Sequence, residues 1–519
     1  MVANRADTRR ALHGLRAVRR RRHFEDQDWT DSVYKAYLAM IVAGLATFYL
    51  SPVFGEGHVS ASFLDEVHHR GAAVLGVVFA MALLLGLRSG ARGGPLALQE
   101  PDVVHVLLAP LRRATALRAA ALSQLRSLVF LAALSGAVAG TLASHRMPGP
   151  DPSWIATGAA LGVLLAFVVW GGALLASGAR LSMRTVTSAG VALVGWATFD
   201  VVTRSATSPT SQIGRVGLAP LDWSPWALLG IGVALALPIA GLALAGGISL
   251  ELAQVRASLV GQLRFAATLQ DIRTVMVLHR QLAQERPWAK SWWQVSTRAF
   301  RSACWHRDWQ GIARWPAARV ARGIALSAVA GAALAATWYG ATPLVLVAGI
   351  ALFFAALDAA EGLAQETDHP ERAAGYPELW GWLILRHLAV PVALLTIVEL
   401  PALAVFVVLT GTMTPLWVAA LSLAIAATSA SVAAATMIVL GAPRPDAMFM
   451  LGFPEIGSFV IALRQLFPVA LVVAAVAPVA IADQTHGYRV DPVLFAAVGV
   501  VALSGALLFW LRSRRFAFG

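Results

Sequence analysis

Cysteine and lysine are both scarce in this chain, and each scarcity excludes a kind of site. The 519 residues include one cysteine, Cys304, so no disulfide can form within the chain and no pair of thiolates can hold zinc. The two lysines are Lys35, after Tyr34, and Lys290, after Ala289. A P-loop needs a lysine directly after a glycine to reach the phosphates of a nucleotide. The chain therefore contains no P-loop, and any ATP hydrolysis that it depends on must come from another protein.

Charged residues are also few. They make up 13% of the sequence, whereas hydrophobic residues make up 58%, and the mean hydropathy is +0.68. This composition is typical of a helical protein that crosses a membrane many times. In so apolar a chain, we expect the net charge of +13 to set the membrane topology and to contact anionic lipid, and we expect no nucleic acid partner. We also expect no cleavable signal sequence, because the chain is basic and polar before its first apolar run.

Several apolar runs are long enough to cross about 30 Å of hydrocarbon as a helix, at about 1.5 Å per residue. The sequence therefore predicts an all-α polytopic membrane protein with about 12 transmembrane helices. The predicted spans are 33–53, 71–88, 119–144, 154–177, 185–203, 225–250, 319–338, 342–361, 384–411, 415–440, 457–481 and 491–511.

An even number of spans places both chain ends on one side of the membrane, and the basic residues indicate which side. In this arrangement about 36 of the 41 Lys and Arg residues fall on the side of the termini. Cytoplasmic loops of membrane proteins carry the excess of basic residues. We therefore expect the N- and C-termini to be cytoplasmic.

A long polar stretch in the middle of the sequence divides the spans into two sets of six. We predict that residues 1–32 form an amphipathic connecting helix, 33–250 the first six-span half, 251–318 a cytoplasmic linker with a second connecting helix, and 319–519 the second six-span half. The second connecting helix carries an aromatic stripe between arginines, which is typical of a helix lying in the membrane interface. The alternative is a solvated linker helix.

Each predicted half places a polar segment between its second and third spans. The first segment runs from Leu96 to Arg118, and the second runs from Leu363 to Arg386. Both begin Leu-Ala, reach Gln-Glu, and carry an Asp two residues after that Glu. We interpret this recurrence as a duplicated six-helix unit with pseudo-symmetric halves, in which each copy presents a short helix to the cytoplasm. The alternative is a pair of ordinary loops.

Six spans, a leading interfacial helix and the segment LLAPLRRATALR resemble the permeases of bacterial ATP-binding-cassette exporters. The resemblance implies that this segment is a coupling helix, which docks in a groove of a cytoplasmic ATPase subunit. It implies two ATPase subunits for each chain, because both permease halves lie in one chain, and a location in the bacterial cytoplasmic membrane. ATP and Mg would be bound by those subunits, and no cofactor by this chain. The residues assigned to coupling are Leu108, Pro110, Leu111, Arg112 and Arg113 in the first half and Tyr376, Pro377, Glu378 and Leu379 in the second.

The second coupling segment departs from the basic pattern of the family. Its surroundings are acidic, since Glu361, Glu366, Asp368 and Glu371 lie nearby in the sequence. We therefore expect the two halves to meet the ATPase subunits in different ways.

Four side chains inside predicted spans are candidates for a substrate path. Asp200 and Glu399 are ionisable groups, and such groups cost about 2.5–3.5 kcal/mol at the centre of a membrane helix. Trp170 and Trp196 lie too deep for an interfacial belt. A mostly apolar lining suits a hydrophobic or amphipathic cargo, such as a lipid, a drug or a peptide. The alternative for the two carboxylates is a structural role in buried hydrogen bonds. No catalytic residue and no metal site is predicted.

Two other functions stay open from the sequence. A secondary active transporter of the major-facilitator type also has six-plus-six spans, although the turn after the second span lacks the Gly-x-x-x-Asp-Arg pattern of that family. A membrane enzyme acting on lipid-linked substrates would need carboxylates clustered at one membrane face, and the acidic run from Glu361 to Glu378 is the candidate. The favoured prediction is a transport subunit that is not an enzyme.

Overall fold

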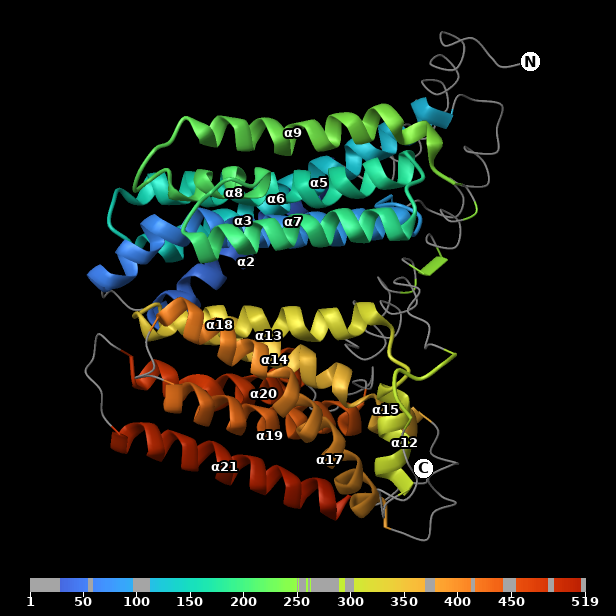
Figure 1. The fold of residues 1–519 in the computed structure, drawn as a ribbon, viewed down its shortest axis with the longest axis vertical. Helices are drawn as coiled ribbons and strands as arrows, with labels where there is room; N and C mark the ends of the chain where they lie inside the picture. Colours follow the sequence, from blue (N-terminus) through green and yellow to red (C-terminus); the bar gives the residue numbers. More distant parts are fainter. Residues whose placement is uncertain are drawn as a thin grey trace. The chain divides into compact units, whose positions relative to one another are not determined.

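The structure is a computed structural model in which all regular elements of the described residues are helices (Figure 1). It describes residues 29–54, 59–96, 113–249, 251, 258–259, 262, 289–294, 303–368, 379–411, 416–441, 454–483 and 490–514. The chain divides into two compact units, Met1–Arg264 and Phe265–Gly519. The predicted connecting helix at residues 1–32 falls almost entirely outside the described residues, which begin at Trp29.

The first unit is built from long helices and three short ones that follow the fifth and sixth predicted spans. Its elements are α2 (Trp29–Phe54), α3 (Ala61–Ala91), α5 (Arg113–Ser144), α6 (Asp151–Gly178), α7 (Met183–Thr203), α8 (Pro209–Gly214), η2 (Arg215–Leu218), α9 (Trp226–Leu244) and η3 (Ala245–Gly247).

The second unit begins with an amphipathic helix, and two of its predicted spans are bent. Its elements are α12 (Ala303–Ile312), α13 (Ala317–Trp338), α14 (Leu344–Ala359), α15 (Glu361–Asp368), α17 (Trp380–Val398), α18 (Leu400–Thr410), α19 (Leu416–Leu440), α20 (Pro454–Ile481) and α21 (Val490–Ser513). The axis turns by 57° between α14 and α15. The break between α17 and α18 lies at Glu399, which is followed after one residue by Pro401.

Many of these helices are apolar enough to cross a membrane. Among the described residues, ten are long and apolar enough, and α14 with α15 would make an eleventh if the bent pair is one span. Helix α2 contains a shorter apolar stretch, Ala36–Phe48. The all-helical, multi-pass membrane class predicted from the sequence is therefore confirmed, whereas the number of twelve spans stays a prediction.

The fourth long helix is the centre of each unit. In the first unit α6 packs against α3, α5 and α9, while α3 also packs against α7 and α2 against α5. In the second unit α19 packs against α14, α17 and α21, while α14 also packs against α20 and α13 against α18. The most apolar windows of α6 and α19 are 50% and 72% buried, the largest shares within their units. Five pairings thus recur at the same places in the order of each unit. The extensive contacts of α19 with α20 and of α13 with α14 have no counterpart of similar extent in the first unit.

Helices α5 and α6 approach each other closely because glycines line their contact. A Cβ atom at Gly136 would meet the carbonyl oxygen of Gly158, and a Cβ atom at Gly158 would meet the carbonyl oxygen of Gly136. Small residues allow two membrane helices to bring their backbones together, and the gain in van der Waals contact holds them there. This pairing anchors α5, the helix that follows the first predicted coupling segment.

Replacing Gly158 by leucine should therefore destabilise the first unit. We expect Gly158→Leu to lower the free energy of unfolding by about 3 kcal/mol, because the backbone of α5 must move away. The matched control is Gly232→Leu on α9, since nothing lies within 4 Å of a Cβ atom at that position. The measurement is the temperature at which the purified protein loses its monodisperse size-exclusion peak. Equal temperatures for the two variants would contradict this account of the contact.

Candidate functional site

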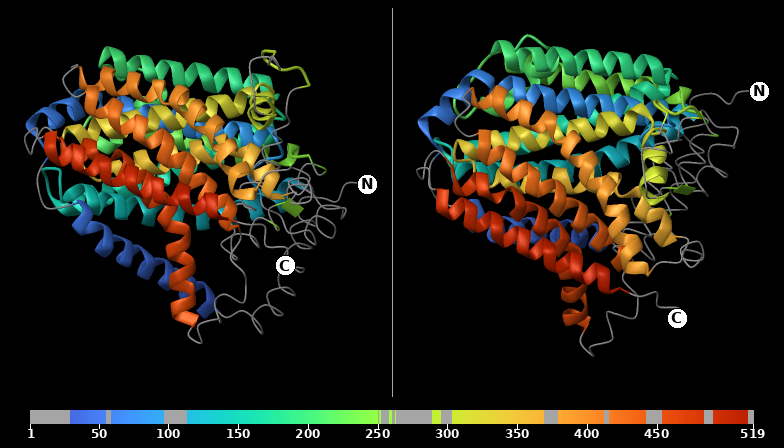
Figure 2. Two further views of the ribbon diagram at one scale, coloured as in Figure 1. Left: turned by 90° about the horizontal axis from the view of Figure 1, so that it is seen from below. Right: turned by 60° about the horizontal axis from the view of Figure 1, so that its bottom comes forward.

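The candidate site lies around α12, the amphipathic helix that opens the second unit. In Figure 1 and Figure 2 this helix runs across the direction of the long helices of its unit. Cys304, Asp308 and Ile312 are buried and recur every four residues, so they share one face of the helix. That face packs against α17 and α15. Cys304 contacts Leu383 in a small apolar cluster.

A buried hydrogen bond joins α12 to α17. The Nδ1 atom of His387 lies 2.6 Å from Oδ2 of Asp308, and the two residues are 1% and 8% exposed. Gly362 of α15 lies against the same carboxylate, because a Cβ atom at this position would collide with it. The aspartate thus lies where three helices meet, and a larger residue at position 362 would separate them.

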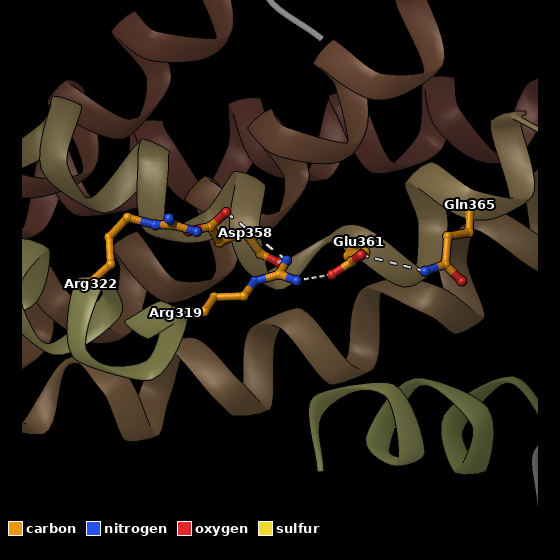
Figure 3. A network of polar contacts seen from close by, with 5 residues as sticks. All are labelled: Arg319, Arg322, Asp358, Glu361 and Gln365. Atoms are coloured by element: carbon orange, nitrogen blue, oxygen red, sulfur yellow. Dashed lines mark hydrogen bonds and ion pairs between the residues drawn. The ribbon is translucent and has the colours of Figure 1, made fainter. Parts of the chain in front are cut away.

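A second set of polar contacts joins α13 to the end of α14 and to α15 (Figure 3). Arg319 donates to the carboxylate of Glu361 and, at 2.5 Å, to the backbone oxygen of Asp358. Arg322 donates through Nε to Oδ2 of Asp358 at 2.7 Å. Gln365 reaches the other oxygen of Glu361 at 3.5 Å, and the guanidinium of Arg319 lies 4.1 Å from the centre of the Trp315 ring. These contacts fix the bend between α14 and α15.

A third contact joins α12 directly to α15. Arg307 pairs with Glu366, whose side chain is 1% exposed. We call the whole set the polar clamp. It consists of Arg307, Asp308, Arg319, Arg322, Asp358, Glu361, Glu366 and His387. The clamp ties α12 to α15 and α17, and it ties α13 to α14 and α15, at the place where α15 leads into residues 369–378.

In the first unit, arginines donate to backbone oxygens at the ends of α9 and η3. Arg118 of α5 donates to the backbone oxygens of Leu242 and Ala243 at 2.8 and 2.9 Å, and Arg180 donates to Gly247 at 2.7 Å. These oxygens belong to the last turns of α9 and η3, where carbonyl groups lack helical partners and carry partial negative charge. Arg118 and Arg180 therefore cap helix ends of the first unit. Arg464 does the same for the last residue of α19, Leu440, in the second unit.

Most of the predicted coupling residues lie outside the described residues. This applies to Leu108, Pro110, Leu111, Arg112, Tyr376, Pro377 and Glu378. Arg113 is the first residue of α5, and Leu379 is the N-cap residue of α17 with 71% of its surface exposed. Their role in coupling stays a prediction.

Asp200 lies near the end of α7 and has many partners. It is fully buried and accepts hydrogen bonds from the backbone N–H groups of Thr207 and Ser208 at 3.0 and 2.8 Å. The hydroxyl groups of Thr207, Ser205 and Ser211 also donate to it. This carboxylate holds the start of α8, whose residues from Thr210 to Gly214 are buried against the unit.

The other three candidates for the substrate path differ in whether their polar side-chain atoms have hydrogen-bond partners. Trp196 is 47% exposed, and its Nε1 donates to Thr207 at 2.9 Å. Trp170 is 4% exposed, and its Nε1 is a buried donor without a partner in the part of the chain that the structure describes. Glu399 is 4% exposed at the break between α17 and α18, and its Oε1 likewise has no partner there.

Sequence reasoning missed the polar clamp. Its signals were weak, since Arg319 and Arg322 three residues apart can be ordinary basic residues at the start of a span, and Asp358 falls at the end of another. Asp308 and His387 are 79 residues apart, so only the fold brings them together. Within the described ranges, no group of three or more His, Cys, Asp and Glu side chains is arranged to hold a metal ion.

Comparisons with known proteins add no identification. No protein-family model, no curated protein and no solved structure matches the chain.

Removing one charge of the polar clamp should destabilise the second unit. We expect Arg319→Gln to lower the free energy of unfolding by about 2 kcal/mol, because it removes the ion pair with Glu361 and the hydrogen bond to the backbone of Asp358. Arg184→Gln is the matched control, since Arg184 is an exposed arginine at the start of α7 and makes no ion pair within the described residues. That change should cost less than about 0.5 kcal/mol. Thermal unfolding followed by tryptophan fluorescence compares them, and equal midpoints would show that the clamp contributes no stability.

Proposed function

We propose that this chain is the membrane-spanning permease subunit of an ATP-driven exporter of the ATP-binding-cassette type. It moves a hydrophobic or amphipathic substrate outward, using ATP hydrolysed by two separate cytoplasmic ATPase subunits. The observation that carries the proposal is the polar clamp, which ties an interfacial helix to the helices on both sides of the second predicted coupling segment. The five helix pairings that recur in both units support two six-helix halves within one chain.

The polar clamp indicates which helices would move together if an ATPase subunit pushed on residues 369–378. These residues leave α15 and enter α17 through Leu379. Helix α15 is joined to α12 by the Arg307–Glu366 pair and to α13 by the Arg319–Glu361 pair, while α17 is joined to α12 by the Asp308–His387 hydrogen bond. A force on this segment would therefore move α12, α13, α15 and α17 together, and both termini would lie on the side of the ATPase in a bacterial cytoplasmic membrane.

The path residues divide into two groups under this proposal. The polar atoms of Asp200 and Trp196 are hydrogen-bonded to Thr207 and Ser208, the residues that precede α8. We therefore assign Asp200 and Trp196 a structural role. Trp170 and Glu399 keep a buried polar atom that no described group satisfies, and an opening of the helices would make these atoms available to cargo. Leaving such an atom unsatisfied is costly, which is typical of functional positions in membrane helices.

Glu399 also supports a second candidate, a proton-driven secondary transporter. A buried carboxyl group at a helix break, with one oxygen unpartnered in the described part of the chain, is a common element of proton relays in membrane transporters. Glu399→Gln separates the candidates. An ATP-driven permease should keep ATP-dependent transport when the proton gradient is collapsed. A proton-driven carrier should lose transport when the gradient is collapsed and also when Glu399 is replaced by Gln.

The direct test is purification of the chain together with the product of an adjacent ATPase gene. We expect a stable complex whose ATP hydrolysis falls at least tenfold when Pro110, Leu111, Arg112 and Arg113 are replaced by alanine, because docking against the ATPase is lost. Purification without any ATPase subunit, or unchanged hydrolysis in this variant, would contradict the proposal.

Cross-linking locates the ATPase on the permease. In a Cys304→Ser background, Leu379→Cys should cross-link to a cysteine placed in the docking groove of the ATPase, because Leu379 is 71% exposed beside the second coupling segment. Phe495→Cys is the matched control. Phe495 is 82% exposed but lies on α21 far from Arg512, whose backbone oxygen contacts Gly381 at the start of α17. Phe495 and Arg512 are 17 positions apart, which corresponds to about 25 Å along the helix. Cross-linking from position 495 instead of 379 would show that the ATPase binds at the opposite end of the helices, which would contradict the proposal.

A further inference from the structure

An open hollow of about 400 Å³ lies beside the polar clamp. It is bounded by α12, by the turn that joins α12 to α13, and by the start of α15. The polar and aromatic side chains that line it are Arg307, Gln310, Arg314, Trp315, Arg319 and Gln365.

The accessible charge of the hollow is positive. Its two acidic residues are Asp308, which is 8% exposed and bonded to His387, and Glu361, whose side chain is 29% exposed and whose charge is paired with Arg319. Arg307 pairs with Glu366 but keeps 39% of its side chain exposed. The side chain of Arg314 is exposed and makes no ion pair or hydrogen bond within the described residues. An exposed guanidinium with free N–H groups binds a phosphate group through two parallel hydrogen bonds.

Aromatic side chains place the hollow at the level of lipid headgroups. Trp292 is 52% exposed, its backbone N–H donates to Ala313 at 2.7 Å, and its Nε1 donates to Trp315 at 2.8 Å, so it is fixed on the turn that borders the hollow. Tryptophan is enriched at membrane–water interfaces. Beyond the turn, α13 exposes Val320 and Ile324, which are four residues apart on one face. Cations at the headgroup level next to an exposed apolar helix face match the two parts of a phospholipid.

We propose that this hollow binds the headgroup phosphate of an anionic phospholipid. Arg314 and Arg307 would hold the phosphate, and the acyl chains would lie along the exposed face of α13. The bound lipid would connect the turn at Arg314 with α12 and so reinforce the polar clamp. This inference is independent of the ATPase, because it concerns the permease chain and the lipid alone.

The test measures lipid binding by native mass spectrometry of the purified chain. Dioleoyl phosphatidylglycerol is the probe, and dioleoyl phosphatidylcholine is the reference lipid. We expect the wild type to prefer phosphatidylglycerol and Arg314→Gln to weaken that binding roughly tenfold, as for loss of one hydrogen bond to a charged group. Arg184→Gln is the matched control, because Arg184 is an exposed arginine at the start of α7 and does not line the hollow. It removes the same charge and should bind as the wild type does.

Three results would overturn the proposal. One is an equal preference for phosphatidylglycerol in Arg314→Gln and Arg184→Gln. Another is displacement of the lipid by soluble glycerol 3-phosphate at millimolar concentration, which would indicate a site for a free phosphate ester. The third is no preference for phosphatidylglycerol in the wild type together with loss of ATPase binding in Arg314→Gln, which would make the hollow a protein-docking surface. None of these results bears on ATP hydrolysis by the wild-type complex, so the proposed function is tested separately.

Discussion

The need to compensate charge at the ends of apolar helices is the constraint on which the second unit depends. Taking a carboxylate or a guanidinium out of water costs several kcal/mol unless a partner and further hydrogen bonds compensate it. Glu366, Asp358 and Arg319 are buried, and groups on other helices pair with their charges. Each pair therefore specifies which helix ends lie together. Separating α12 from α15 would leave Glu366 charged and unpaired, so these two helices are expected to move as one body.

The first unit contains arginines that hold helix ends through backbone oxygens. Arg118 and Arg180 donate to backbone oxygens of α9 and η3, and these oxygens are neutral groups that water can also satisfy. Releasing them costs far less than exposing one charge of a buried ion pair to apolar surroundings. Each of these bonds is therefore expected to contribute less to stability than an ion pair of the polar clamp.

The sequence predicted the helical class and most helix positions, because long apolar runs allow few structures in a membrane. It did not predict the bends, since the turn after Ala359 depends on the Arg319 contacts and the break at Glu399 on tertiary packing as well as on Pro401. The sequence also placed the start of the second span too late, at residue 71. In the structure α3 begins at Ala61, and its first turns contain Asp65, Glu66 and Arg70. Spacing along the chain finds pairs within a helix, such as Arg70 with Glu66, but not pairs such as Asp308 with His387.

Asp200 and Glu399 show why residue type alone did not separate structure from function. Both are buried carboxylates in apolar helices, and the sequence assigned both to a substrate path. Asp200 receives hydrogen bonds from the segment that follows it, a run rich in serine and threonine that can fold back onto a helix end. Glu399 is followed by Leu400, Pro401 and further apolar residues, which offer no side-chain donor nearby in the sequence. A carboxylate with local donors is therefore expected to hold its own chain, and one without them is available to a proton or a ligand.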